Sequence, residues 1–225
     1  MKTRFLGPEI LDGDNVPDRE LRASFSFMSF VNRFFGGTRV VLDYFSSHPL
    51  PDRFSVLDIG FGGGDIAYAL SRWAGERGKK AEITGIDLNP FCVRYARERF
   101  QTPSIRYTQA SAFDLGSLGE FDYITASMFF HHLGDEDIVR LLTLMGQHAR
   151  RGFIVNDLYR GWAAYCGAIL LAAPTFRHIL LNDAPLSVKR GFKEEDFERY
   201  RRLANIPKAK IERKPVFRIS LSHHA

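Results

Sequence analysis

Cysteine is scarce in this sequence. Only Cys92 and Cys166 occur among the 225 residues, and they form no CxxC pair. No histidine stands at a spacing typical of metal ligands, so nothing indicates a disulfide framework or a metal site. The first residues, Met1 to Arg4, lack the apolar segment and cleavage site of a secretory signal. We therefore expect a reduced, cytoplasmic protein without a metal.

Long apolar runs are also missing. The longest, Trp162 to Pro174, is interrupted by Gly167 and falls short of the roughly 20 residues that a membrane span needs. The hydrophobic fraction of 45% is ordinary for a globular protein. A chain of 225 residues fits one α/β domain with a small appendage.

The formal net charge of +5 is spread unevenly. Between Lys189 and Arg218 there are 11 Lys/Arg and 5 Asp/Glu, a local excess of +6. Such an excess is compatible with contact to nucleic acid or to an anionic membrane surface. The alternative is the solvated face of a C-terminal helix and strand, which we favour.

The first 50 residues show a helical pattern. Apolar residues from Phe25 to Phe35 are crowded near helical spacing, and Gly36-Gly37 ends this segment. A second helix is expected over Thr38 to Phe45. It ends before His48-Pro49, because the residue preceding a proline resists the helical conformation. We interpret residues 1–50 as an N-terminal helical cap.

Strands and helices alternate after residue 50. We expect strands at 54–59, 83–87, 105–109, 123–127 and 152–156, and helices over about 66–74, 91–100 and 136–148. Connections this short between alternating elements predict right-handed crossovers and a parallel sheet covered on both faces.

The C-terminal part differs from this alternation. A helix at 194–204 precedes two strand-like runs, 209–212 and 216–221, which are joined at Arg213-Lys214-Pro215. Strands joined so tightly must be antiparallel. The expected fold is therefore a seven-stranded, mostly parallel α/β sheet with an antiparallel C-terminal hairpin. It occupies residues 51–225, with an inserted helical segment at about 158–186.

A glycine loop follows the first strand, in Asp58-Ile59-Gly60-Phe61-Gly62-Gly63-Gly64-Asp65. A dinucleotide fingerprint would place its third glycine at 65, where pyrophosphate meets the helix N-terminus. Here that glycine is Gly64, and Asp65 would repel pyrophosphate while capping the helix. The ligand should therefore lack phosphate at this point. S-adenosylmethionine meets this requirement, and Asp58 would attract its amino group.

The segment from Asp58 to Gly64 resembles the first motif of class I S-adenosylmethionine-dependent methyltransferases, and the likeness extends over about residues 54–157. It implies a Rossmann-like fold, with Gly60, Gly62 and Gly64 against the cofactor and S-adenosylhomocysteine as product. In the family an acidic residue ending the second strand binds the ribose hydroxyls, which implies Asp87 here. Leu88 would then cover one face of the adenine.

The third motif departs from the family pattern. Many members place an aspartate where this sequence has Ser111. The serine hydroxyl can still accept a hydrogen bond from the adenine amino group, although more weakly. The neighbours Ala112 and Phe113 would contact the adenine, and Asp114 is interpreted as a turn residue.

The fourth motif carries the candidate catalytic residues. The run from Ser127 to Leu133 resembles the loop where methyl group and acceptor meet, with Ser127 bordering the methionine part of the cofactor. A histidine with a pKa near neutrality can take a proton from an acceptor hydroxyl, so His131 or His132 would act as the base. The alternative is an imidazole that only braces the loop.

The segments outside these motifs select the acceptor. Phe25 to Phe35 are expected to form a lid, and 162–176 an inserted helix facing it; both are apolar and aromatic, which favours a small lipophilic phenol or quinone-like acceptor. A nucleic-acid methyltransferase is disfavoured, because amino-methylating members carry a Pro-Pro-aromatic loop where this chain has Met128 and Phe129. A non-catalytic cofactor-binding module stays open. The sequence does not determine the oligomeric state.

Overall fold

The structure, a computed structural model, describes residues 1–13 and 15–224. Its strands are β1 (Arg53–Ile59), β2 (Lys80–Asp87), β3 (Ile105–Gln109), β4 (Phe121–Ser127), β5 (Ala149–Leu158), β6 (Lys210–Lys214) and β7 (Arg218–His224). They form one seven-stranded sheet in the order β3-β2-β1-β4-β5-β7-β6. Strands β1 to β5 run parallel to one another, while β7 runs antiparallel to both β5 and β6. The predicted Rossmann-like fold with an antiparallel C-terminal hairpin is confirmed.

The hairpin turn lies later than predicted. Strand β6 continues through Arg213 and Lys214, and β7 begins only at Arg218. Val216 and Phe217 have φ angles of 57° and 59°, a left-handed conformation that cannot continue a strand. The prediction placed both residues in the strand because they are apolar and, in Val216, β-branched, a composition typical of strands, whereas here they form an exposed turn.

The α-helices are α1 (Asp18–Phe34), α2 (Gly37–Ser46), α3 (Asp65–Gly75), α4 (Pro90–Phe100), α5 (Leu115–Leu118), α6 (Asp135–His148), α7 (Trp162–Ala172), α8 (His178–Arg190) and α9 (Glu194–Leu203). Short 3₁₀ turns are η1 (Ile10–Asp12), η2 (Phe130–His132) and η3 (Ala173–Thr175). Most predicted helices are found within a few residues of their expected limits. The inserted segment expected at about 158–186, with one helix at 162–176, instead holds α7, η3 and a separate α8 that extends to Arg190. The short α5 was not predicted, since four residues are too few to show a helical period.

Two apolar cores lie on the two faces of the sheet. Residues of α2, α3 and α4 pack with alternate residues of the central strands, such as Val56, on one face. Residues of α5, α6 and α9 pack on the other face with the intervening residues, such as Leu57. This division follows from the period of two along each strand, which sends successive side chains to opposite faces.

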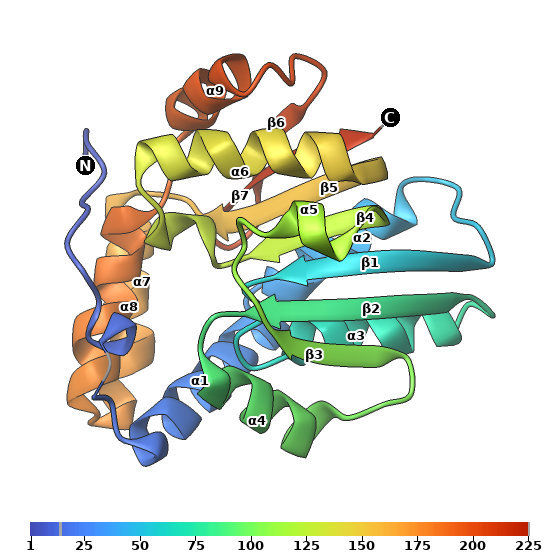
Figure 1. Cartoon of the computed structure of the whole chain (residues 1–225). Coiled ribbons are helices and arrows are strands. Elements are labelled where there is room, and N and C mark those ends of the chain that lie inside the picture. The colour runs from blue at the N-terminus through green and yellow to red at the C-terminus, as the bar shows by residue number, and fades with distance from the viewer. Residues whose placement is uncertain (14, 225) are drawn as a thin grey trace.

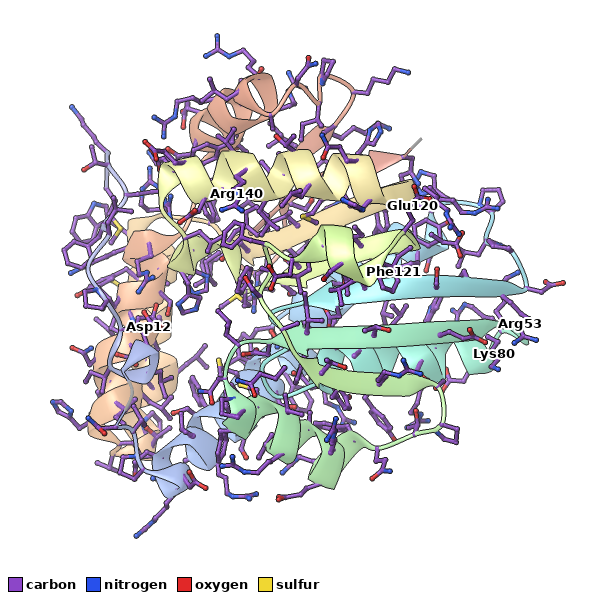
Figure 2. The ribbon with its side chains drawn as sticks, viewed as in Figure 1. Asp12, Arg53, Lys80, Glu120, Phe121 and Arg140 are labelled. Atoms are coloured by element: carbon purple, nitrogen blue, oxygen red, sulfur yellow. The ribbon has the colours of Figure 1, made fainter. Side chains whose placement is uncertain are left out.

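The carboxyl ends of the parallel strands face α1, α7 and α8, and the N-terminal segment runs along these helices (Figure 1). In open α/β sheets, ligands bind at this edge. Asp12 lies at this edge, whereas Arg53 and Lys80 lie at the opposite one (Figure 2). Every predicted site residue follows the carboxyl end of a strand or stands on it.

Among the described residues, no helix is both long and apolar enough to cross a bilayer.

Candidate active site

The glycine loop connects β1 to α3 in a conformation that only glycine adopts easily. Gly60, Gly62 and Gly64 have φ angles of 64°, 53° and 80°, which a Cβ atom disfavours. At Gly64 a Cβ atom would also lie 2.8 Å from the Tyr107 hydroxyl and 2.9 Å from the Ala96 Cβ. The spacing noted in the sequence thus reflects a backbone that must bend sharply and approach its neighbours closely. Gly64 is the N-cap of α3, so Asp65 is its first residue and not the predicted cap.

Asp87 joins the glycine loop to the end of β2. Its Oδ2 accepts a hydrogen bond from the Gly62 amide at 3.0 Å, and its Oδ1 accepts one from the Asn89 amide at 2.9 Å. Burial nevertheless raises the pKa of this carboxyl above its usual range. Each carboxylate oxygen keeps a further lone pair, so Asp87 can still accept from a pair of hydroxyls.

Three acidic residues surround the loop. Asp58 is buried at the end of β1 and accepts a hydrogen bond from Thr125 Oγ1 at 2.8 Å. Burial, together with the neighbouring Asp65 and Asp87, raises the pKa of Asp58 to about 7. Asp65 accepts a hydrogen bond from Asn32 Nδ2 at 3.1 Å, and its pKa is also raised by burial. Positive charge nearby would relieve the repulsion among these carboxylates.

The residues predicted to contact adenine lie beyond β2 and β3. Leu88 is 68% exposed, which leaves its apolar surface uncovered. Ser111 Oγ accepts a hydrogen bond from the Phe113 amide at 3.1 Å and shapes the loop itself. Ala112 is buried, and the Arg140 guanidinium stands over the Phe113 ring at 4.7 Å.

Two aromatic side chains cover the glycine loop. A Cβ atom on Gly60 would lie 2.2 Å from the Phe129 ring, and one on Gly62 would lie 3.4 Å from the Phe25 ring. Phe25 comes from α1, so the N-terminal helix reaches this loop. Phe30 and Phe34, on the same helix, are 48% and 63% exposed. Only part of the predicted aromatic segment therefore faces the site.

A buried polar group borders the loop after β4. Ser127 is buried and accepts a hydrogen bond from Asn156 Nδ2 at 2.8 Å. Met128 has a φ of 57°, an uncommon conformation that often marks functional sites. The fully buried Arg218 donates to the Met128 sulfur and, at 3.4 Å, to Asn32 Oδ1. Burial lowers the pKa of Arg218 to about 10, although Asp157 and Asp65 oppose this change.

Each of the two candidate histidines is held by a carboxylate. His131 is buried, and its Nδ1 lies 2.7 Å from Asp157 Oδ1. Although burial alone would raise it, His131 keeps the pKa of Asp157 below its usual range. His132 is 30% exposed, and its Nδ1 lies 2.9 Å from Asp12 Oδ1. In both residues the free ring nitrogen is Nε2, because the carboxylate occupies the Nδ1 side.

Residues that were not predicted complete this side of the site. Glu9 and Asp12 come from the N-terminal segment, and Arg190 ends α8. The Arg190 guanidinium donates to Asp12 Oδ2 at 2.7 Å and to the His131 carbonyl at 3.0 Å. Burial raises the pKa of Glu9 to about 7. Asp183 of α8 anchors the segment by accepting the amides of Ile10 and Leu11 at 3.0 and 2.9 Å.

These residues were missed because no local motif marks them. Glu9 stands 122 positions before His131, and Arg190 stands 59 positions after it. Only the acidic character of the short run Glu9 to Asp12, inside the proposed cap, could have drawn attention to them.

Comparison with known proteins agrees with this geometry. Residues 56–152 match a family model described as a methyltransferase domain. This span includes the glycine loop, Asp87 and both histidines. A search of curated proteins gave no match. The match covers less than half of the chain, and over this span it supports the predicted class, an S-adenosylmethionine-dependent class I methyltransferase.

Solved structures share the fold across nearly the whole chain. Human N-acetylserotonin methyltransferase in complex with S-adenosylmethionine has a TM-score of 0.64 and 18% identity, over 92% of this chain and 56% of that one. The plantazolicin methyltransferase in complex with S-adenosylhomocysteine has a TM-score of 0.65 and 14% identity, over 93% and 91%. The magnesium protoporphyrin IX methyltransferase of Synechocystis PCC 6803 has a TM-score of 0.57 and 16% identity, over 94% and 88%. The present chain thus spans only about half of the human enzyme.

Proposed function

We propose that this protein transfers a methyl group from S-adenosylmethionine to a small, lipophilic aromatic acceptor, such as a phenol or a quinone-like compound. The observation that carries the proposal is the placement of two sites at one edge of the sheet. The acidic glycine loop fits a cationic nucleoside without phosphate, and two carboxylate-held histidines lie beside it.

The residues at the loop fit the cofactor. The three glycines allow the sharp bend of the loop, Asp87 offers lone pairs to the ribose hydroxyls, and Asp58 offers negative charge to the amino group. Ser111, Ala112, Phe113 and Leu88 would border the adenine, and Ser127 the methionine part. When bound, S-adenosylmethionine supplies a methyl group on a positively charged sulfur, which is a good leaving group.

The histidines would activate the acceptor. With Nδ1–H donated to Asp157, His131 presents the lone pair of Nε2. A hydroxyl that reaches this nitrogen can transfer its proton there while the Asp157 carboxylate stabilises the resulting imidazolium. His132 has the same arrangement with Asp12 and greater exposure. Either residue can therefore serve as the base.

The surroundings of the site and similar enzymes both favour this acceptor class. Phe25 and Phe129 supply apolar walls at the glycine loop. The similar structures are named for an acetylserotonin, a porphyrin and plantazolicin as acceptors. We propose that residues 1–35 act as a lid over the acceptor, since Phe25 reaches the loop and Glu9 reaches the histidines.

Two measurements test this function. Calorimetry should show binding of S-adenosylhomocysteine and none of NAD, and methyl-labelled cofactor should turn over with a panel of phenols, quinones, acids and RNA. His131→Gln should lose turnover but keep cofactor binding, whereas His178→Gln, an exposed change in α8, should keep both. Tight binding of NAD without binding of S-adenosylhomocysteine would refute the proposal. Labelled RNA without labelled small molecules would refute the acceptor class.

The lid is tested separately by amide hydrogen exchange. Exchange in residues 1–35 should slow when S-adenosylhomocysteine and an acceptor are added together, because the lid must open for exchange of ligands. An unchanged exchange rate there, in protein that turns over, would assign this segment to packing alone.

A further inference from the structure

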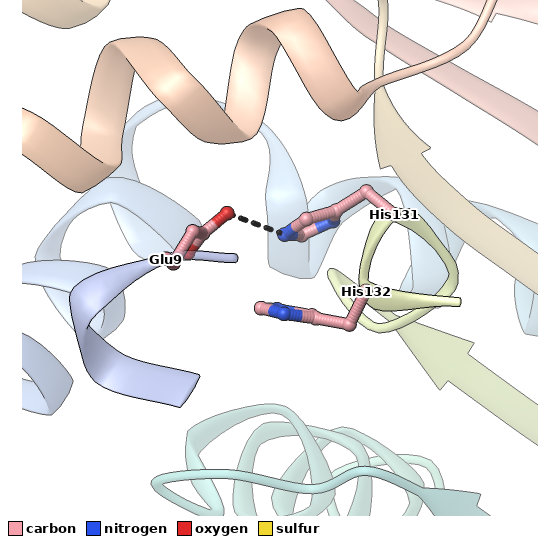
Figure 3. Close-up of side chains that lie close together, drawn as sticks. All are labelled: Glu9, His131 and His132. Atoms are coloured by element: carbon pink, nitrogen blue, oxygen red, sulfur yellow. Dashed lines mark ion pairs between the residues drawn. The ribbon is translucent and has the colours of Figure 1, made fainter. Parts of the chain in front are cut away.

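Glu9, His131 and His132 converge although they come from distant parts of the chain. Glu9 precedes η1, whereas the histidines end η2. One ligand atom from each residue lies within 4.8 Å of the other two. Glu9 and His131 are buried, and the three side chains face a common space (Figure 3).

The two imidazoles are oriented as metal-binding histidines are. Asp157 lies on Nδ1 of His131 at 2.7 Å, and Asp12 lies on Nδ1 of His132 at 2.9 Å. A carboxylate on one ring nitrogen fixes the tautomer and leaves the other nitrogen with a free lone pair, as in carboxylate–histidine–zinc arrangements. Both Nε2 atoms are therefore available as ligands.

The distance between Glu9 and His131 is too long for a hydrogen bond and is compatible with two ligands of one ion. Glu9 Oε1 and His131 Nε2 are 3.8 Å apart, beyond the range of about 2.7–3.2 Å for a hydrogen bond. Two ligands that each stand about 2.0–2.2 Å from one ion are separated by up to roughly 4 Å. Small side-chain movements would bring the His132 ring to the same ion.

The positive charge nearest to Glu9 is engaged mainly by other groups. Arg190 is the cation nearest to Glu9, with Nη1 3.9 Å from Oε1, but it donates to Asp12 at 2.7 Å and to the Gly7 carbonyl at 3.1 Å. Ser187 donates to Glu9 Oε1 at 2.8 Å. Among the residues that the structure describes, Glu9 thus has a hydroxyl partner and only the distant, already engaged Arg190 as a cationic one.

We propose that Glu9, His131 and His132 form a binding site for a divalent transition-metal ion, with Zn²⁺ as the best fit. Two imidazole nitrogens and one carboxylate are a ligand set of catalytic zinc sites, which keep a fourth position open. The nitrogen ligands disfavour Mg²⁺ and Ca²⁺, which prefer oxygen. The sequence prediction of no metal did not foresee this site, because Glu9 is far from the histidines in the chain.

The ion would change how the acceptor is activated. A hydroxyl that occupies the open position binds through oxygen and loses its proton to solvent water more easily, because the ion stabilises the oxyanion. The histidines would then be ligands and not bases. This consequence rests on the proposed function, whereas ion binding itself does not.

Co²⁺ is the probe for the site, because it absorbs visible light when bound by nitrogen and oxygen. Full-length protein freed of metal with a chelator is titrated with Co²⁺, and Zn²⁺ is then added in competition. We expect one Co²⁺ per chain and its displacement by Zn²⁺. Glu9→Gln and His132→Gln should each weaken Co²⁺ binding more than about 100-fold. Asp12→Asn should weaken it about 10–100-fold, because Asp12 only orients a ligand histidine.

Matched control variants test whether other histidines bind the ion. His48 and His224 stack with ring centroids 3.1 Å apart at another place in the fold, so His48→Gln and His178→Gln should leave Co²⁺ binding unchanged. If Glu9→Gln does not fold, ¹⁵N NMR spectra of the histidines in the wild-type protein serve as the test in its place. Zn²⁺ should then shift the Nε2 resonances of His131 and His132. No stoichiometric Co²⁺ binding, or binding lost only in His48→Gln, would overturn the site.

Two results separate the metal site from the proposed methyl transfer. Methyl transfer that persists in chelator, with no bound Co²⁺, would overturn the metal site and leave the histidines as bases. Bound Co²⁺ without binding of S-adenosylhomocysteine would overturn the proposed function and leave the metal site.

Discussion

The two sides of the site are built differently. The cofactor side, defined here as Asp58, the glycine loop and Asp87, lies within 30 residues of the chain. The histidine side, defined as Glu9, Asp12, His131, His132, Asp157 and Arg190, draws on residues 181 positions apart. The cofactor side is an acidic turn, and two neighbouring strands set its position. The second is a network in which carboxylates, imidazoles and a guanidinium hold one another.

The two sides should be vulnerable to different changes. The cofactor side depends on backbone shape and on three carboxylates whose repulsion a cation relieves. The histidine side depends on the docking of the N-terminal segment against α8. Changes at a distance should therefore damage the histidine side first and leave the cofactor side intact.

The largest effect is expected from Arg160→Met. The Arg160 side chain is buried and donates to Asp196 at 2.9 Å, to the Gly191 carbonyl at 2.6 Å and to the Lys2 carbonyl at 3.1 Å. Removing one partner of a buried ion pair costs about 3–5 kcal/mol. Urea unfolding should show this loss in the free energy of unfolding, while Arg39→Met, on the surface, should leave the midpoint unchanged. A loss below 1 kcal/mol would show that the N-terminal segment is held by other contacts.

The second largest effect is expected from Asp87→Ala, which should affect only the cofactor side. Its carboxylate organises the Gly62 amide and offers lone pairs to hydroxyls. Losing charged hydrogen bonds costs roughly 1.5–3 kcal/mol, or about ten- to a hundredfold in the dissociation constant of S-adenosylhomocysteine. Calorimetry measures this change, with the exposed Asp52→Ala as control. Unchanged affinity in folded Asp87→Ala would remove Asp87 from the cofactor site.

Affinity for S-adenosylmethionine should depend on pH through Asp58. Burial, with Asp65 and Asp87, raises the pKa of Asp58 to about 7. A protonated, neutral Asp58 cannot attract a cation, so affinity should fall about tenfold between about pH 8 and about pH 6. Asp58→Asn should bind weakly with a flat profile. An equally steep profile in this variant would assign the titration to another group.

The same carboxyl should lower stability at high pH. A pKa raised above the unfolded value contributes stability that is present below the ordinary carboxyl pKa and is lost as pH rises through about 7. Thermal unfolding at alkaline pH should therefore show Asp58→Asn to be more stable than the wild type. Equal stability of the two proteins there would mean that the carboxylate is well solvated when charged.

The smallest effect is expected from Ser111→Ala. Its hydroxyl accepts from the Phe113 amide and can accept once more from adenine. A neutral hydrogen bond is worth about 0.5–1.5 kcal/mol, which corresponds to about a two- to tenfold loss of cofactor affinity. A loss as large as that of Asp87→Ala would place Ser111 among the principal cofactor residues.

The sheet could be predicted from the sequence, and the proposed cofactor side rests on local sequence patterns as well. The glycine spacing, the acidic residue ending the second strand and the alternation of elements are local patterns, because a turn or a strand depends on adjacent residues. It misplaced the hairpin turn at Val216 and Phe217, whose apolar character hid their left-handed backbone.

Only the tertiary structure decided the histidine side. His131 and His132 were visible in the sequence, but their partners were not, because contacts between distant segments leave no spacing to detect. Asp157, near the end of β5, reaches His131 in the η2 turn after β4. Glu9 and Asp12 reach the histidines because Asp183 and Arg190 hold the N-terminal segment. Buried charges must find such partners when the chain folds, since an unpaired charge in the interior is too costly to keep.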